Sequence, residues 1–313
     1  MMKQEICFAI VLSLFIPFLG IGQLEKSSAD SWVDYASGDY EIHANITYAT
    51  ANNTPLKLDF YLPRKRPIPL PTVIFFHGGG WVAGQKEQNM FELLPYLSLG
   101  MAVVNVEYRL ASNSPAPAAV EDCRCALHWV VSHAKYFSLD TSKIVVTGGS
   151  AGGHLALMTG MLPANSIFDR QCATNDSVRW SSGIEPRVRV AAIVNWFGIT
   201  DVVELLEGTN AKHYAIEWFG SIMDRKALAQ ELSPITYVRS GLPPIITIHG
   251  DSDNIVPYSQ AVRLHASLDK AGVPNRLVTI HGGMHDGFTR QELIDGFKAV
   301  REFLRKFSIL PRE

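Results

Sequence analysis

The sequence predicts an α/β protein whose mostly parallel sheet is covered by helices on both faces. Short apolar runs typical of buried strands recur along the chain, and stretches with helical periodicity lie between them. Strands that alternate with helices favour a parallel sheet, because the crossover helices must cover both of its faces. Two alternating polar and apolar segments near the start indicate an antiparallel hairpin at one edge of this sheet.

The individual elements follow from these patterns. The hairpin strands are expected at 45–50 and 56–62, joined by the turn-forming stretch Ala-Asn-Asn-Thr-Pro. Buried strands are expected at 72–76, 101–106, 143–147, 189–196, 245–248 and 275–280. The helical pattern is clear at 118–134, 154–161, 259–271 and 290–307.

Two longer segments, 163–186 and 198–241, interrupt the alternation of strands and helices. Insertions in such folds fall in loops at the functional edge of the sheet. We therefore expect these segments to form walls or a partial lid over a site there. The second insertion has helical character around 211–219 and 224–232.

Composition narrows the class of protein. The chain has 313 residues, of which 47% are hydrophobic, enough for one large core. Charged residues make up 19% and the formal net charge is −2, which argues against a nucleic-acid partner. With no internal repeat or low-complexity tract, we expect one domain over residues 23–313 that acts on small or neutral groups.

The first 22 residues have the pattern of a secretory signal peptide. Residues 6–21 are almost wholly apolar, and Gly20 and Gly22 occupy the −3 and −1 positions for cleavage before Gln23. The run is shorter than the roughly 20 apolar residues that a membrane-spanning helix needs. The alternatives are an uncleaved anchor or a buried helix. A secreted or periplasmic protein without a stable membrane anchor is expected.

Three cysteines would remain after cleavage: Cys123, Cys125 and Cys172. An odd number leaves at least one free thiol. Cys172 has two alternative partners, because Cys123 and Cys125 point to different faces of the expected helix. The simplest interpretation treats all three as small buried apolar side chains. A metal site is not expected, since no second cysteine pair completes one.

The strongest motif is Gly-Gly-Ser-Ala-Gly-Gly at 148–153, between an expected strand and an expected helix. This strand–turn–helix context is that of a nucleophile elbow, which presents Ser150 on a sharp turn between minimal side chains. An incidental serine in a glycine-rich turn is the alternative. A phosphate-binding loop is disfavoured, because the Gly-Lys-Ser/Thr sequence and the Gly-x-Gly-x-x-Gly spacing are both absent.

A second motif, His-Gly-Gly-Gly-Trp at 77–81, directly follows the strand expected at 72–76. Consecutive glycines let the backbone approach a substrate and aim N–H groups at one point. We assign the N–H groups of Gly79, Gly80 and Ala151 as the oxyanion hole, in which each donor contributes about a hundred- to a thousandfold in rate. His77 is expected to brace this loop.

Two late loops supply the remaining groups for acyl transfer. Asp253 follows the strand expected at 245–248, and His285 follows the strand that ends at Ile280. The chain order Ser, Asp, His is that of a hydrolase triad, in which the histidine moves the proton and the aspartate orients it. Asp251 and His281 are the rival candidates. Such a triad needs no metal or cofactor.

These motifs resemble the α/β-hydrolase superfamily, and within it the esterase and lipase group with an HGGG oxyanion motif. The resemblance extends from about Asn45 to Phe307. The residues around the glycine motif and the stretches 107–110 and 121–122 are similar to bacterial carbohydrate esterases, which include acetylxylan and feruloyl esterases. In that group, Arg109 and Asp122 would form a structural ion pair.

The resemblance implies a serine esterase that hydrolyses acetyl or feruloyl esters on polysaccharide. Trp81 and Trp196 are predicted to bind substrate by stacking, with core packing as the alternative. Other aromatic candidates are Phe197, Trp218 and Phe219. Alternative functions are a formamidase similar to kynurenine formamidase, a short-chain carboxylesterase or lipase, and a non-catalytic binding protein.

Overall fold

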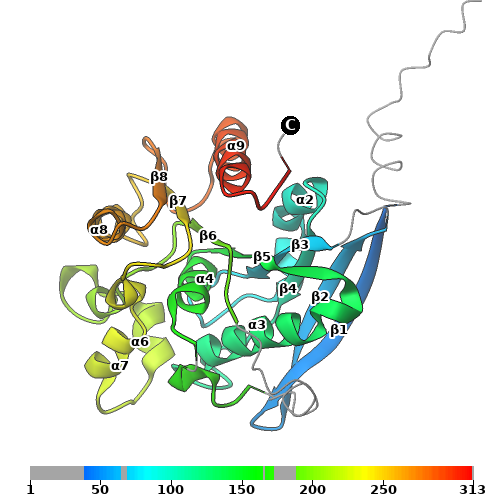
Figure 1. Ribbon diagram of the computed structural model, residues 1–313. Helices are drawn as coiled ribbons and strands as arrows, with labels where there is room; N and C mark the ends of the chain where they lie inside the picture. Colours follow the sequence, from blue (N-terminus) through cyan, green and yellow to red (C-terminus); the bar gives the residue numbers. More distant parts are fainter. Residues whose placement is uncertain (1–38, 65–68, 165, 173–187, 312–313) are drawn as a thin grey trace, which may run out of the picture. The chain divides into compact units, whose positions relative to one another are not determined.

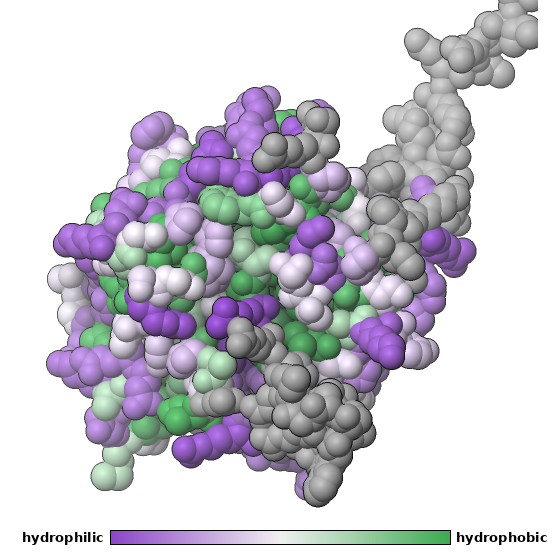
Figure 2. All heavy atoms as spheres, viewed as in Figure 1, coloured by the Kyte–Doolittle hydropathy of each residue, from purple (hydrophilic) through white to green (hydrophobic). Residues whose placement is uncertain are grey.

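The computed structural model describes residues 39–64, 69–164, 166–172 and 188–311 (Figure 1). The predicted signal peptide, residues 1–22, lies outside the described residues, as does most of the first insertion. Within the described ranges no helix is both long and apolar enough to cross a membrane. On the face shown in Figure 2, hydrophilic and hydrophobic side chains are interspersed.

The described residues form an eight-stranded sheet in the order β1-β2-β4-β3-β5-β6-β7-β8. Strand β1 pairs antiparallel with β2 and β2 with β4, whereas all other pairs are parallel. This confirms the predicted fold class, with the hairpin at the edge. The strands span Tyr40–Ala51, Thr54–Pro63, Leu70–Phe76, Ala102–Val106, Leu139–Gly149, Ala192–Trp196, Ile245–Gly250 and Asn275–Ile280.

Helices cover both faces of the sheet (Figure 1). Alternate residues of β3 face opposite sides, so Ile74 joins the cluster formed with α3, α4 and α8. Its neighbour Phe75 joins the cluster formed with α2 and α9. The α-helices are α2 Met90–Ser98, α3 Ala118–Phe137, α4 Ala151–Met161, α6 His213–Phe219, α7 Arg225–Glu231, α8 Tyr258–Lys270 and α9 Arg290–Lys306.

Several elements differ from the sequence prediction, and β1 and β5 begin five and four residues earlier than expected. Helix α2 was not expected, and it contains Pro95, but the i, i+3, i+4 spacing of its buried side chains anchors it on the sheet. Helix α4 begins at Ala151, directly after the elbow serine, because the small residues there pack tightly in its first turn. Strand β6 begins at Ala192, three residues later than expected.

The second insertion consists of short helices. Besides α6 and α7, it contains three 3-10 turns, η3 Val203–Leu205, η4 Gly208–Asn210 and η5 Pro234–Tyr237. Two further 3-10 turns lie elsewhere, η1 Lys86–Asn89 before α2 and η2 Ile167–Asp169 after α4.

One disulfide bond and one ion pair stabilise helix α3. Cys125 forms a disulfide bond with Cys172, while Cys123 stays free and buried. The interpretation of all three cysteines as unpaired apolar side chains is therefore wrong: helix α3 turns Cys125 toward the segment after η2. The predicted ion pair is confirmed, with the Nη2 atom of Arg109 2.7 Å from the Oδ1 atom of buried Asp122.

Candidate active site

Ser150 lies on a strained turn between β5 and α4. Its φ of 56° and ψ of −121° place a non-glycine residue in a rarely populated backbone region. The turn packs against the end of β3, where a Cβ on Gly148 or Gly152 would lie only 2.3 or 2.0 Å from the carbonyl oxygen of Phe76. Glycine at these positions therefore allows the sharp turn that presents the serine side chain.

The glycine loop after β3 lies beside Ser150. Gly79 and Gly80 have φ values of +111° and +61°, and both line the same pocket as the serine. A Cβ on Gly79 would lie 2.0 Å from the carbonyl oxygen of Ala83, so the tight turn requires glycine there. The predicted third donor, the N–H of Ala151, belongs to the first residue of α4.

His77 braces this loop, as predicted. Its Nδ1 lies 2.7 Å from the carbonyl oxygen of Gly78, and its ring stacks on Tyr108 at a centroid distance of 4.1 Å. Burial lowers the pKa of His77 to about 4, so the ring is neutral near pH 7. The hydroxyl of Tyr108 donates to the carbonyl oxygen of His77 at 2.8 Å, which fixes the start of the loop.

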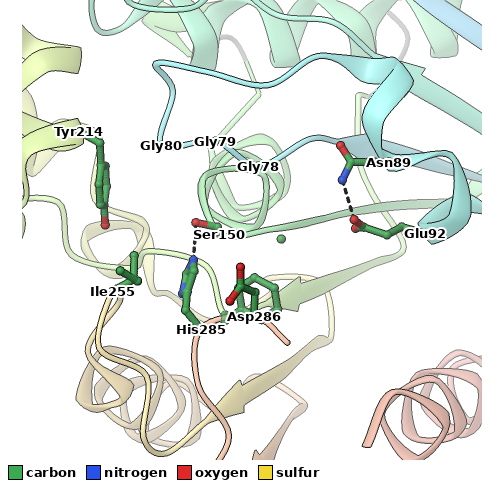
Figure 3. A pocket seen from close by; sticks show the side chains of 12 residues that line it. Gly78, Gly79, Gly80, Asn89, Glu92, Ser150, Tyr214, Ile255, His285 and Asp286 are labelled. Carbon is green, nitrogen blue, oxygen red and sulfur yellow. Dashed lines mark hydrogen bonds between the residues drawn. The ribbon is translucent and has the colours of Figure 1, made fainter. Parts of the chain in front are cut away.

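A continuous series of hydrogen bonds joins the three residues predicted as a triad. The Nε2 atom of His285 lies 2.9 Å from the Oγ atom of Ser150, and its Nδ1 atom lies 2.7 Å from the Oδ2 atom of Asp253. Figure 3 shows the imidazole of His285 turned toward the serine. These distances are within the range for proton transfer between positioned groups. The structure thus brings together residues separated by up to 135 positions in the chain.

The carboxylate of Asp253 is buried and held in its charged form. Burial alone would raise its pKa, but hydrogen bonds from His249 and His285 outweigh this and hold the pKa of Asp253 below its usual range. Its Oδ1 atom also accepts the backbone N–H groups of Ile255 and Val256 at 2.8 and 2.9 Å. An ionised, fixed carboxylate can orient an imidazole and stabilise its cation.

His249 is a residue of this site to which the sequence patterns assigned no role. It lies near the end of β7, fully buried, with Nε2 2.9 Å from the Oδ2 atom of Asp253 and 3.2 Å from the carbonyl oxygen of Val256. Because a carbonyl oxygen only accepts hydrogen bonds, Nε2 carries the proton and donates. The available signal was a histidine on a buried strand end, directly before the aspartate loop.

The two late loops contact each other closely, which sets the distance between aspartate and histidine. A Cβ on Gly250 would lie 2.2 Å from the carbonyl oxygen of Gly283, and the N–H of Ser252 donates to that oxygen at 3.0 Å. The rivals Asp251 and His281 form a separate pair, with Nδ1 2.9 Å from Oδ2. The His281 side chain is 88% exposed, so this pair belongs to the surface.

A pocket of about 420 Å³ opens above Ser150. In Figure 3, Tyr214 and Ile255 lie on one side of the serine, while Asn89, Glu92 and Asp286 lie on the other. The Nδ2 atom of Asn89 donates to the Oε1 atom of Glu92 at 2.6 Å. Sequence analysis did not single out Asn89, Glu92 or Tyr214, because no local motif marks them. The lining residues are Gly78, Gly79, Gly80, Asn89, Glu92, Gly149, Ser150, Phe197, Tyr214, Ile255, His285 and Asp286.

The prediction that Trp81 and Trp196 stack on substrate needs correction, because both side chains lie in the core. Trp81 is fully buried, and its ring stacks on Trp218 at a centroid distance of 4.1 Å. Its Nε1 donates to the Nδ1 atom of His154 at 3.2 Å, which satisfies its polar atom. Trp196 is 6% exposed and packs against Phe297. Neither tryptophan lines the pocket.

Of the other three aromatic candidates, two lie in the core and one lines the pocket. Trp218 and Phe219 are fully buried. Phe197 lines the pocket and packs edge-on against the imidazole of His285 at a centroid distance of 4.9 Å. It therefore supports the histidine from within the pocket wall.

Within the described residues, one group has side-chain atoms spaced for a metal ion. Ligand atoms of His128, Asp169 and Cys172 lie within 4.8 Å of one another. The sulfur of Cys172 is bonded to Cys125, however, and both carboxylate oxygens of Asp169 accept hydrogen bonds from Arg124. The sulfur and both carboxylate oxygens therefore already have bonding partners within the protein, and the group fits a structural role.

The elbow serine, the buried aspartate and the histidine follow β5, β7 and β8 in that chain order, which is typical of the α/β-hydrolase fold. Residues 58–268 match the BD-FAE family, so the chain belongs to this family of α/β-hydrolase esterases.

Solved structures of esterases are similar over nearly their whole length. A truncated form of a carbohydrate esterase from gut microbiota superimposes with a TM-score of 0.71 and 26% identity, covering 86% of this chain and 96% of that one. Propionate-bound esterase 2 of Thermogutta terrifontis gives a TM-score of 0.71 and 27% identity, with 89% and 98% coverage.

Curated relatives are larger proteins. The probable carboxylic ester hydrolase LipM of Mycobacterium tuberculosis is 30% identical over 197 residues, which cover 61% of this chain and 43% of LipM. A probable isoprenylcysteine α-carbonyl methylesterase of Arabidopsis thaliana is 24% identical, with 77% and 50% coverage. The chain thus spans about half the length of these relatives.

Proposed function

We propose that this protein is a serine esterase in which Ser150, His285 and Asp253 form the catalytic triad. The single observation that carries the proposal is the unbroken series of hydrogen bonds from Ser150 Oγ through the imidazole of His285 to the buried carboxylate of Asp253. A serine hydroxyl is a weak nucleophile at neutral pH, and an adjacent oriented base activates it.

The reaction proceeds through an acyl-enzyme. His285 accepts the hydroxyl proton through Nε2 while the Oγ atom of Ser150 attacks the ester carbonyl carbon. The N–H groups of Gly79, Gly80 and Ala151 stabilise the negative charge that develops on the carbonyl oxygen. The imidazolium then protonates the departing alcohol, and water releases the acid by the same steps in reverse order.

We propose acetyl or feruloyl esters of polysaccharide as the substrate class. The similarity to a carbohydrate esterase supports this class. Asn89, Glu92 and Asp286 also supply amide and carboxylate groups on one side of the pocket, where they can bind sugar hydroxyls. Among the described residues that line the pocket there is no Lys or Arg, in keeping with a neutral substrate.

We also propose that residues 1–22 direct the protein to the periplasm or the outside of the cell. The disulfide between Cys125 and Cys172 supports an oxidising compartment, because reducing cytosol disfavours such bonds.

The test compares the native chain with Ser150→Ala on p-nitrophenyl acetate, p-nitrophenyl butyrate, methyl ferulate and acetylated xylan. Loss of the serine is expected to lower kcat by up to about a millionfold. Asp253→Asn should lower kcat by about ten-thousandfold, whereas its matched control Asp251→Asn should stay near native. Equal rates for native and Ser150→Ala proteins, or no activity on any ester, would contradict the proposal. N-formylkynurenine, hydrolysed faster than every ester, would instead indicate an amidase.

A further inference from the structure

The hydroxyl of Tyr214 is a buried polar group beside the candidate nucleophile. Tyr214 lines the pocket of Ser150, yet no group in the described part of the chain lies within hydrogen-bonding distance of its hydroxyl oxygen. Buried polar atoms in native proteins are nearly always hydrogen-bonded, so an unpaired one at a site calls for an explanation.

The position of this tyrosine is fixed by packing. Its side chain covers the glycine loop so closely that a Cβ on Gly80 would lie 2.9 Å from the Cβ and Cγ atoms of Tyr214. Its ring also contacts Trp81 at a centroid distance of 5.9 Å, and Trp81 stacks on Trp218 of the same helix, α6. Helix α6 thereby holds the hydroxyl at one place relative to the glycine loop.

The hydroxyl lies on the side of the pocket away from its amide and carboxylate groups. In Figure 3, Tyr214 and Ile255 lie together on one side of Ser150, opposite Asn89, Glu92 and Asp286. Of these two lining residues, Tyr214 is the one with a polar side-chain group. Burial raises the pKa of Tyr214 well above its usual value, so the hydroxyl keeps its proton and acts as a neutral donor.

We propose that the hydroxyl of Tyr214 donates a hydrogen bond to an acceptor oxygen that the substrate carries outside its scissile ester group. This inference rests on the esterase function proposed above. An oxygen-bearing substrate gains a hydrogen bond from this donor, whereas a substrate without such an oxygen leaves the buried donor unpaired. The site would therefore select esters whose acyl or alcohol part bears hydroxyl, methoxy or ring oxygens over hydrocarbon analogues.

The test uses Tyr214→Phe, which keeps the ring and removes the hydroxyl alone. Two matched pairs of esters separate the two sources of the oxygen: methyl ferulate with methyl cinnamate for the acyl part, and acetylated xylose with cyclohexyl acetate for the alcohol part. The ratio of kcat/KM for the oxygen-bearing ester over its analogue is expected to fall about five- to tenfold in one pair, the effect of one hydrogen bond. The affected pair identifies the part of the substrate that Tyr214 contacts.

The control is Tyr237→Phe, since the hydroxyl of Tyr237 donates to the carbonyl oxygen of Glu231 outside the pocket. It should leave both ratios unchanged, and thermal melting should be similar for the two variants. If Tyr214→Phe lowers kcat/KM equally for all four esters, or changes neither ratio, the role of Tyr214 is overturned while the esterase function stands. A native protein inert on all four esters would overturn both proposals.

Discussion

The Nε2 atom of His249 lies 2.9 Å from the Oδ2 atom of Asp253, the same oxygen that the Nδ1 atom of His285 approaches to 2.7 Å. With the two backbone N–H groups on Oδ1, the carboxylate accepts four hydrogen bonds, which is its full capacity. A carboxylate bound on every side cannot rotate, so His249 acts as a positioning residue for the aspartate.

Replacing His249 tests this role. His249→Phe keeps a ring at the site and removes the donor, and we expect kcat/KM to fall about ten- to a hundredfold, the effect of one hydrogen bond to a charged group. The pKa of Asp253 should also rise toward its ordinary value, because a hydrogen bond that lowers it is lost. The carboxyl of Asp253 should then take up its proton at a higher pH than in the native protein.

The measurements are kcat/KM and an NMR titration of the Asp253 carboxyl, with His281→Phe as the control because that histidine pairs with Asp251 at the surface. A lowered kcat/KM with an unchanged titration of Asp253 would mean that His249 only fills space in the core.

The disulfide between Cys125 and Cys172 is expected to stabilise the folded state substantially. It closes a loop of 47 residues, and the chain-entropy model then predicts about 4 kcal/mol. The double variant Cys125→Ala/Cys172→Ala should lose about that much free energy of unfolding, measured by denaturant titration. A reductant should destabilise the native protein and leave the double variant unaffected. If Cys123→Ala, which alters the free buried thiol, costs as much as the double variant, packing and not the cross-link is responsible.

Much of the fold followed from local patterns. Strands β3 and β4 and the second half of β5 are buried, and their apolar runs marked them in the sequence. Glycine-rich motifs at the ends of β3 and β5 marked these two further. Helix α2 escaped notice because Pro95 interrupts a short pattern whose buried face is apparent only once the sheet is present. Helical periodicity separated Cys123 from Cys125, but only tertiary packing decides which of them meets Cys172.

The sequence predicted some residues of the candidate site and missed others. Ser150, Asp253 and His285 stand in loops that follow strands, so chain order pointed to these loops. Asp251 and His281 satisfy the same order, and the hydrogen bonds of the structure separate the two pairs. Tyr214 and Glu92 come from an insertion and from the unexpected helix, and contacts distant in sequence bring them to the pocket. Trp81 was misplaced because the amphipathic indole suits either a sugar or a core, and here the core contacts of the ring prevail.

Acid should weaken the fold through Asp169. Burial raises the pKa of this carboxyl, but interactions with His128 and Arg124 outweigh burial and hold the pKa at about 2, below the ordinary 3.8. A carboxyl with a lowered folded-state pKa stabilises the protein above its unfolded pKa and ceases to do so as pH falls through the folded value. The stabilisation is therefore complete above about pH 4 and lost toward pH 2.

Urea titrations of the native protein and Asp169→Asn at several pH values check this expectation. The difference in free energy of unfolding should be constant above about pH 4 and shrink by about 1–2 kcal/mol toward pH 2. Asp295→Asn, on the exposed face of α9, is the control for a carboxylate outside the ion pair. A difference that keeps its size down to pH 2 would show that Asp169 acts through shape and hydrogen bonding alone.

The acidic side of the pocket should discriminate against anionic esters. Glu92 and Asp286 line it, and the part of the lining that the structure describes holds no lysine or arginine. A negatively charged substrate therefore meets like charge close to Ser150. We expect p-nitrophenyl butyrate to be preferred over p-nitrophenyl hemisuccinate, an ester of similar size that carries a carboxylate. Glu92→Gln should lower the ratio of kcat/KM for the butyrate over the hemisuccinate about three- to tenfold. Added salt should diminish this effect of the substitution.

The pH dependence gives this prediction its sharpest test. Burial raises the pKa of Glu92, although the hydrogen bond from Asn89 partly opposes the shift. Glu92 therefore loses its charge at a higher pH than an ordinary glutamate, and the advantage of Glu92→Gln on the hemisuccinate should fade as pH falls. Glu302→Gln, a surface substitution on α9, should leave the preference unchanged at every pH. If Glu92→Gln behaves in the same way as Glu302→Gln at low salt and neutral pH, shape and not charge sets the choice between neutral and anionic esters.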